Sequence, residues 1–196
     1  MKRNNLFVLI LLFWSLAPFF WQVYTSFSTT ESIISPFSYV QNRWTLNNYI
    51  QVLTANPPFW RYLLNSTIVG LSSTGLTLLI ATPAAYAISK VRVNVERIIR
   101  LFLLGVSLFP YVLLFLSLLE IARVLGIGNN LFALSIPYSA LSMPLAVLLL
   151  CSAFKDLPKD LEEAARIEGL DLWQRLRWVL MPLISPAIAS TGIIIF

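Results

Sequence analysis

Carboxylate, guanidinium and amide side chains gather in one stretch of this chain, Leu157 to Pro186, which reads LPKDLEEAARIEGLDLWQRLRWVLMPLISP. It is the only long polar segment in a sequence that is otherwise mostly apolar. Charged groups in such a segment can recognise the surface of another molecule through ion pairs and hydrogen bonds. We therefore expect any specific contact with a soluble partner to be made here.

Two helices are expected to present these charges. Asp156 and Pro158 are expected to open the first helix, and Glu162 and Glu163 place negative charge in its first turns, where the helix dipole favours it. Gly169 lies where this helix should stop, and a left-handed residue is expected there.

The second helix begins at Asp171, which forms a capping-box pattern with Gln174. Apolar residues then recur at helical spacing along one face, and the other face is basic, which is typical of a helix lying along a membrane surface. Pro182 and Pro186 mark the turn into the next apolar run. The apolar face consists of Leu172, Trp173, Leu176, Val179 and Leu180.

The spacing of this segment resembles the EAA loop of the membrane-spanning permease subunits of binding-protein-dependent ABC importers. Glu163-Ala164-Ala165 is followed after three residues by Gly169, and after nine more by Val179-Leu180-Met181-Pro182. The resemblance implies that a coupling loop, about residues 155–182, docks into a cleft on a separate ATPase subunit. The alternative is an amphipathic helix that only rests at the membrane interface. The coupling residues implied are Glu163, Ala164, Ala165, Gly169 and Pro182.

The composition indicates a membrane protein, because 58% of the residues are hydrophobic, 12% are charged and the mean hydropathy is +0.77. Apolar runs predict spans at about 6–27, 63–88, 101–122 and 131–154, and a fifth run starts at Leu183. The predicted fold is all-α, a polytopic membrane helical bundle that forms a single domain over residues 1–196. We expect the fifth span to be cut short at Phe196 and the sixth span of the family to be missing.

Small residues and prolines shape the predicted spans. Pro110 lies near the middle of the third span, and Pro137 and Pro144 are expected to break the fourth. Small side chains recur along one face of the second span and predict close helix packing there, with a groove for the substrate as the alternative. This seam consists of Ser66, Gly70, Ser73, Thr77, Ala81 and Ala84.

The distribution of basic residues predicts the orientation. Eleven lysines and arginines fall on the side that holds the N-terminus and the EAA-like loop, whereas only Arg43, Arg61 and Arg123 fall on the other side. By the positive-inside rule, the N-terminus and the loop are cytoplasmic, and the 28–62 segment is an external loop. The net charge of +5 therefore requires no nucleic acid partner.

The sequence supplies no energy source of its own. Glu120 is the only clear ionisable group within the spans, which argues against ion-coupled transport. Gly-Lys-Ser and Gly-Lys-Thr, the ends of a phosphate-binding loop, are absent. There is no histidine, and the single cysteine, Cys151, is expected to be a packing residue, so we expect no metal site and no cofactor in this chain. ATP and Mg²⁺ would be bound by a partner ATPase.

The resemblance implies a complex in the inner membrane of a bacterium or archaeon. It would contain a second, different permease subunit, two ATPase subunits and an external solute-binding protein, with lipid around the spans. The stretches 44–49 and 59–66 resemble the carbohydrate-importing branch, the maltose and glycerol-phosphate type, which favours a sugar or polyol as solute. Hydroxyl side chains at helical spacing are candidates for the substrate path, although helix–helix hydrogen bonding explains them equally well. They are Ser107, Tyr111, Ser135, Tyr138, Ser139 and Ser142.

Two other classes of protein compete with an importer subunit. A membrane-embedded enzyme would need a nucleophile, a metal cluster or a carboxylate pair at bilayer depth, and the sequence contains none of these. A non-transporting membrane scaffold or accessory subunit stays open as the alternative.

Overall fold

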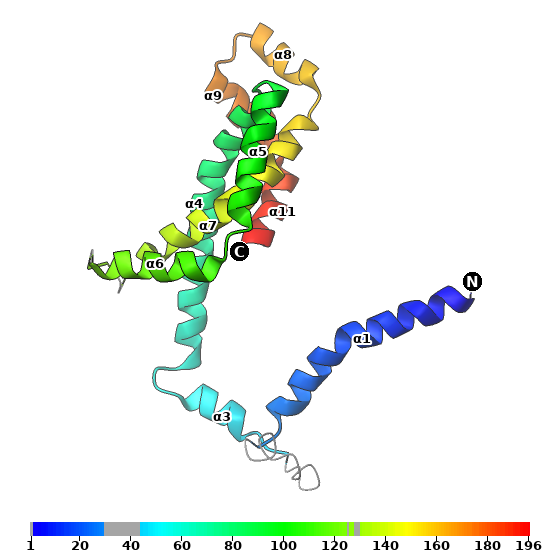
Figure 1. Ribbon diagram of the computed structural model, residues 1–196, viewed down its shortest axis with the longest axis vertical. Helices are drawn as coiled ribbons and strands as arrows, with labels where there is room; N and C mark the ends of the chain where they lie inside the picture. The colour runs from blue at the N-terminus through cyan, green and yellow to red at the C-terminus, as the bar shows by residue number, and fades with distance from the viewer. Residues whose placement is uncertain (1, 30–43, 125, 128–129) are drawn as a thin grey trace. The chain divides into compact units, whose positions relative to one another are not determined.

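The computed structural model describes residues 2–29, 44–124, 126–127 and 130–196, apart from the side chains of residues 2–6, 111–115, 119 and 159. The described residues are mostly helical, and no strand occurs among them (Figure 1). The all-α prediction is therefore confirmed. The chain divides into two compact units, residues 1–63 and 64–196, which are described separately below.

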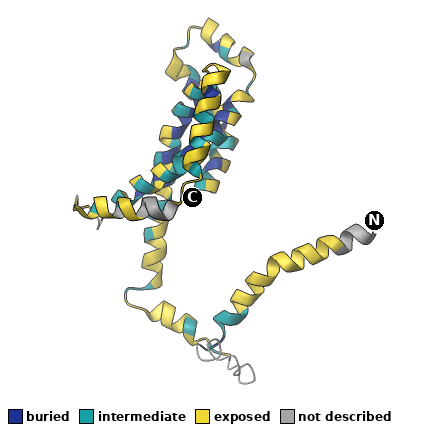
Figure 2. Ribbon diagram, in the orientation of Figure 1, coloured by how far each residue is buried: buried dark blue, intermediate teal, exposed yellow. Residues whose placement is uncertain are grey.

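The first unit contains helices α1 (Lys2–Ser26) and α3 (Asn47–Thr54). The side chains of α1 are exposed over most of its length (Figure 2), and residues 7–26 are long and apolar enough to cross a membrane. Asn48 Nδ2 donates to the carbonyl oxygens of Ser26 and Ser28, both at 2.9 Å, and thereby fixes the start of α3 to the end of α1. Residues 30–43 of the predicted external loop lie outside the described residues.

The second unit is built on two long helices, α4 (Phe59–Ser89, of which 64–89 belong to this unit) and α7 (Leu131–Lys155). Both are long and apolar enough to span a membrane. Ser73, Thr77 and Ala81 of the predicted small-residue seam are buried, as expected for closely packed helices. The core of this unit consists of Ala81, Ala85, Tyr86, Ala146, Val147, Leu150, Cys151, Phe154, Leu176, Leu180 and Ile184.

The third predicted span, at about 101–122, consists of two helices and not one. The chain forms α5 (Val93–Ser107) and then α6 (Tyr111–Val124), with a break at residues 108–110. Figure 1 shows α5 running along the unit and α6 running across it. Pro110 has no N–H to donate, and its ring disfavours helical geometry in the residue before it. The last helical bond of α5 is the one from the amide of Leu108 to the carbonyl of Leu104, at 3.2 Å. The chain leaves helical geometry before Pro110, and α6 starts directly after it.

The fourth predicted span differs in the opposite way. The prediction that Pro137 and Pro144 break it is wrong, because α7 is a single helix through both prolines. Each proline removes one backbone donor, but the rest of the helical ladder persists, as it often does in apolar spans where neighbouring helices support the backbone.

The remaining helices follow α7 closely. They are α8 (Lys159–Ile167), α9 (Leu172–Gln174), the π-helix η2 (Arg175–Leu180), α10 (Met181–Leu183) and α11 (Ser185–Ile195). The helix ending at Leu183 and α11 meet at a bend of 76° at Ile184, close to the predicted turn at Pro182 and Pro186. Among the described residues, three helices could span a membrane, or four if this bent pair is one span. The predicted number of five stays a prediction.

Candidate functional site

The sequence predicts the C-terminal end of helix α8 correctly but not its N-terminal end. Asp156 does not open it, because Asp156 caps the end of α7, and Pro158 precedes α8 with no side-chain cap. Gly169 has φ +84°, which confirms the predicted left-handed residue. The amide of Leu170 bonds to the carbonyl of Ala165, and the amide of Gly169 bonds to that of Arg166, both at 3.1 Å. These two bonds form a Schellman motif that closes the helix.

The second helix of the loop starts shortly after this corner. The predicted capping box is confirmed: the Gln174 amide donates to Asp171 Oδ1 at 2.7 Å, and the Asp171 amide donates to Gln174 Oε1 at 3.0 Å. The helix then widens into the π-turn η2, which the sequence did not indicate. Leu176 and Leu180 of the predicted apolar face are buried, whereas Trp173 is exposed.

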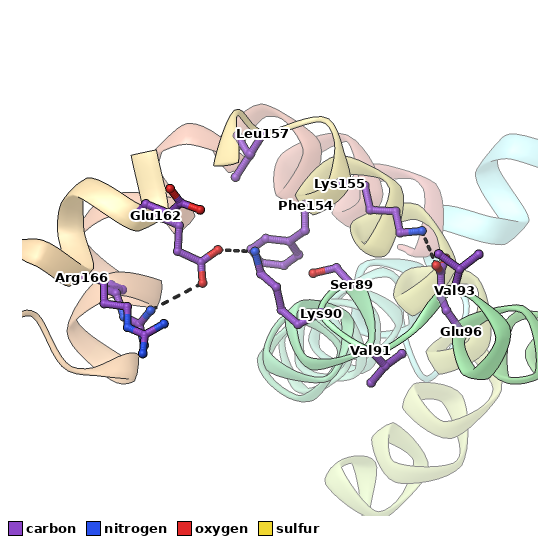
Figure 3. A pocket seen from close by; sticks show the side chains of 12 residues that line it. Ser89, Lys90, Val91, Val93, Glu96, Phe154, Lys155, Leu157, Glu162 and Arg166 are labelled. Carbon is purple, nitrogen blue, oxygen red and sulfur yellow. Dashed lines mark hydrogen bonds and ion pairs between the residues drawn. The ribbon is translucent and has the colours of Figure 1, made fainter. Parts of the chain in front are cut away.

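The carboxylate of Glu162, on α8, is surrounded by donors from two other parts of the chain (Figure 3). Tyr86 of α4 donates its hydroxyl to Glu162 Oε1 at 2.6 Å, and the ammonium of Lys90, just beyond α4, forms an ion pair with Oε2. Arg175 of η2 lies 3.6 Å from Oε1. Because only 17% of the Glu162 side chain is exposed, these contacts are partly shielded from solvent.

The electrostatics of Glu162 follow from these contacts. Burial alone would raise the pKa of its carboxyl group, but the hydrogen bonds from Lys90 and Tyr86 outweigh burial and lower the pKa below its usual value. The Lys90 ammonium also lies 5.4 Å from the centre of the Tyr86 ring, within the range of a cation–π contact. The charged form of Glu162 is therefore the stable one.

A second carboxylate cluster lies beside the first. Glu96 of α5 is buried, and its two oxygens accept from Arg100 at 2.5 Å and from Lys155 of α7. These two hydrogen bonds, that from Lys155 being the stronger influence, lower the pKa of Glu96. This cluster joins α5 to α7.

A pocket of about 610 Å³ lies between the two clusters (Figure 3). Its charged lining contains both signs, and several of these charges already form ion pairs with one another. The lining residues are Ser89, Lys90, Val91, Val93, Glu96, Phe154, Lys155, Leu157, Glu162, Glu163, Arg166 and Arg175.

The predicted coupling residues lie on one continuous stretch but differ in exposure. Glu163 and Ala164 are exposed on α8, and Pro182 is exposed in α10. Ala165 is buried, and Gly169 is exposed at the corner after α8. The structure thus presents an exposed acidic face on a short, capped helix, which is suited to contact with another protein.

The residues that fix this helix in place could not be identified from the sequence pattern. The pattern assigns Glu162 only an effect on the helix dipole, and it does not single out Tyr86, Lys90 or Glu96 as partners. A signal was present, because Glu162 lies three residues before Ala165 and therefore on the same face as this buried residue. Using it would have required knowing which alanine is buried.

The candidates for the substrate path occupy different surroundings. Ser135 and Ser139 are buried against α4, where Ser135 Oγ lies 2.5 Å from Ser72 Oγ and the Ser139 carbonyl accepts from Thr77 Oγ1 at 3.3 Å. These two positions contribute to helix packing. Ser107 bonds to its own helix, Ser142 is half-buried and Tyr138 is 42% exposed. Tyr111 begins α6, and its side chain lies outside the described part of the chain.

Three related proteins match nearly the whole chain. The sulfoquinovosyl glycerol transport system permease protein SmoH of Agrobacterium fabrum is 38% identical over 95% of this chain and 66% of its own length. The trehalose/maltose transport system permease protein MalG of Thermococcus litoralis is 38% identical over 92% of this chain and 65% of its own length. The inner membrane ABC transporter permease protein YcjP of Escherichia coli is 32% identical over 97% of this chain and 68% of its own length.

A solved structure shares the fold. A chain of a bacterial ABC transporter involved in alginate import superposes with a TM-score of 0.72 over 99% of this chain and 68% of its own, at 24% sequence identity. A scan against protein-family models finds no match. The chain spans about two thirds of the length of the relatives named above. Since the sequence similarity covers almost every residue of this chain, the chain belongs to the family of ABC transporter permease proteins.

Proposed function

We propose that this chain is a transmembrane subunit of an ATP-driven solute importer. It forms part of the translocation pathway and couples to a separate ATPase through the loop of residues 155–182. The observation that carries the proposal is α8, a short helix whose EAA-type residues Glu163 and Ala164 are exposed while its C-terminal end and its inner face are fixed. A helix that is rigidly held and exposed on one side is suited to receive a push from a docked partner.

The proposed solute is a sugar or a polyol. Relatives of the chain are named for the transport of sulfoquinovosyl glycerol, trehalose or maltose, and diacetylchitobiose. Hydroxyl and tyrosine side chains can hydrogen-bond such solutes. We place Tyr138, Ser142, Ser107 and Tyr111 at the solute path, while Ser135 and Ser139 contribute mainly through their bonds across the helix interface.

The proposed complex supplies what this chain lacks. A second permease subunit would complete the pathway, two ATPase subunits would bind ATP and Mg²⁺, and a solute-binding protein would deliver the solute from outside. The complex would lie in the inner membrane of the cell, with the N-terminus and the coupling loop in the cytoplasm. The excess of basic residues on that side supports this orientation.

The test is reconstitution of the complex in proteoliposomes. The chain is co-expressed with the candidate ATPase and second permease, purified, and supplied with the solute-binding protein. We expect the loaded binding protein to stimulate ATP hydrolysis and solute uptake together. An ATPase that fails to co-purify, or hydrolysis that does not respond to the binding protein, would instead indicate a scaffold or accessory role.

A further inference from the structure

The two adjacent glutamates of α8 face different surroundings. Glu163 is exposed and makes no hydrogen bond or ion pair within the described part of the chain. Glu162 is 17% exposed at its side chain and binds Tyr86, Lys90 and Arg175. The carboxylate of Glu163 is therefore available to a partner, whereas that of Glu162 is bound within this chain.

We propose that Glu162 is the positioning residue that ties the coupling loop to α4, so that a displacement of α8 is passed into this span. The proposal rests on the proposed function of the loop. It assigns docking of the ATPase to the outer face of α8, and transmission of the movement to Glu162 on the inner face.

The connection continues beyond the ion pair into well-packed residues. The Tyr86 ring, whose hydroxyl binds Glu162, packs edge-on against Phe154 of α7 at 5.4 Å between ring centres. Beside it in α4, Ala85 is fully buried, as is Leu150 on α7. Because this part of the interior is close-packed, a movement of Tyr86 toward Phe154, Ala85 and Leu150 displaces both helices.

Arg175 gives the same carboxylate a second role. It belongs to η2, so its contact at 3.6 Å links α8 to the second helix of the loop. An isolated surface ion pair would contribute little to coupling. Three donors meeting on one shielded carboxylate instead make a junction through which α8, η2 and α4 move together.

The Glu96 cluster provides an internal comparison. It resembles the Glu162 cluster in chemistry, with two cations on one carboxylate, but its hydrogen bonds join α5 to α7 and involve no residue of α8. Its loss should therefore weaken the bundle without separating ATP hydrolysis from transport.

The experiment compares Glu162→Gln with Glu96→Gln in the reconstituted complex. Glu96 is a buried carboxylate on α5 that binds Arg100 of α5 and Lys155 of α7, so it is a control for loss of a charged cluster that does not include α8. For Glu162→Gln we expect the ATPase to co-purify normally, while solute transported per ATP hydrolysed falls about fivefold or more. The control should couple like the unaltered chain. By contrast, Glu163→Arg should reduce the amount of ATPase that co-purifies.

A removable tether separates positioning from a general structural role. Lys90→Cys and Glu162→Cys are combined on a Cys151→Ala background, and a short bis-methanethiosulfonate reagent joins the two thiols. We expect the tether to restore transport per ATP and a reductant to abolish it again. The tether experiment also tests the role of Glu162 if the Glu162→Gln variant accumulates poorly.

The outcomes distinguish the two proposals. If the unaltered complex couples hydrolysis to uptake but Glu162→Gln couples equally well, or if the tether restores nothing, the role of Glu162 is refuted and the importer function stands. If the unaltered complex shows no hydrolysis that responds to a binding protein, the proposed function itself fails.

Discussion

Replacing Gly169 tests the corner between the two loop helices. Its φ of +84° is a conformation that residues with a Cβ adopt at a cost of about 1–2 kcal/mol, and a β-branched side chain is especially unsuited to it. A Cβ at this position would meet no atom within 4 Å, so the cost is conformational and not a steric clash. Gly169→Val should therefore destabilise the corner by about 1–2 kcal/mol or more, and Gly169→Asn by less, because asparagine tolerates this region.

The effect can be measured by hydrogen exchange at the Leu170 amide, which bonds to the carbonyl of Ala165 at 3.1 Å. A loss of about 1–2 kcal/mol raises the open fraction about 5- to 30-fold, so exchange should accelerate by that factor in Gly169→Val. Gly105→Ala is the matched control. A Cβ added at Gly105 would also meet no atom within 4 Å, but this glycine lies inside α5 and lacks a positive φ, so exchange at Leu170 should not change.

Equal exchange rates with valine, asparagine and glycine at position 169 would refute a conformational cost at this corner. Acceleration in the Gly105→Ala control would also contradict it, because the effect would then come from general loosening of the bundle. In the reconstituted complex, Gly169→Val should in addition lower ATPase-coupled transport while insertion into the membrane persists.

Three further predictions concern other parts of the chain. Folding lowers the pKa of Glu96, so its stabilising contribution is present above the unfolded pKa of about 4.3 and is lost as the pH falls through the lower folded pKa. In Glu96→Gln, the thermal unfolding midpoint should therefore depend less on pH in the acid range. A double-mutant cycle of Ser72→Ala and Ser135→Ala should give a coupling of about 0.6 kcal/mol in thermal unfolding, and strict additivity would contradict the 2.5 Å contact. Cysteines replacing the exposed residues Asn94 and Gln51, on a background without Cys151, should react with impermeant reagents from the cytoplasm and from outside, respectively, and reversed labelling would overturn the orientation.

Local signals predicted the corner of the loop correctly. One signal is a glycine after a helical pattern, and the other is an aspartate followed three positions later by a glutamine. Each acts through backbone groups within a few residues, so the local sequence contains the whole interaction. Gly169 and the capping box of Asp171 and Gln174 are of this kind. Long apolar runs likewise predicted α1, α4 and α7, because hydrophobic length alone decides those spans.

Prolines show where local reasoning fails. Pro110 separates two helices, whereas Pro137 and Pro144 lie within one continuous helix. Each lacks the same backbone donor, so the different outcomes depend on the helices that pack around each position. That information is tertiary and cannot be obtained from the spacing of residues.

The candidate site shows the same limit. Glu162 and Glu163 are identical side chains in adjacent positions, and both fit the expectation of negative charge in the first helical turns. Only the packing of α8 against α4, where Tyr86 lies 76 positions from Glu162 in the chain, decides which of them is bound. The family spacing pointed to Glu163, and the residue that fixes the helix was therefore missed.

Every backbone amide in the corner between α8 and α9 is hydrogen-bonded. Four consecutive amides, those of residues 168–171, each donate to an acceptor within the loop, at distances of 3.0 to 3.1 Å. Adding or removing one residue there would leave at least one of these donors without its acceptor and would change the direction of α8. We therefore expect insertions and deletions between α8 and α9 to be tolerated less well than substitutions of Leu170. The number of residues in this corner sets the direction of α8 relative to α9.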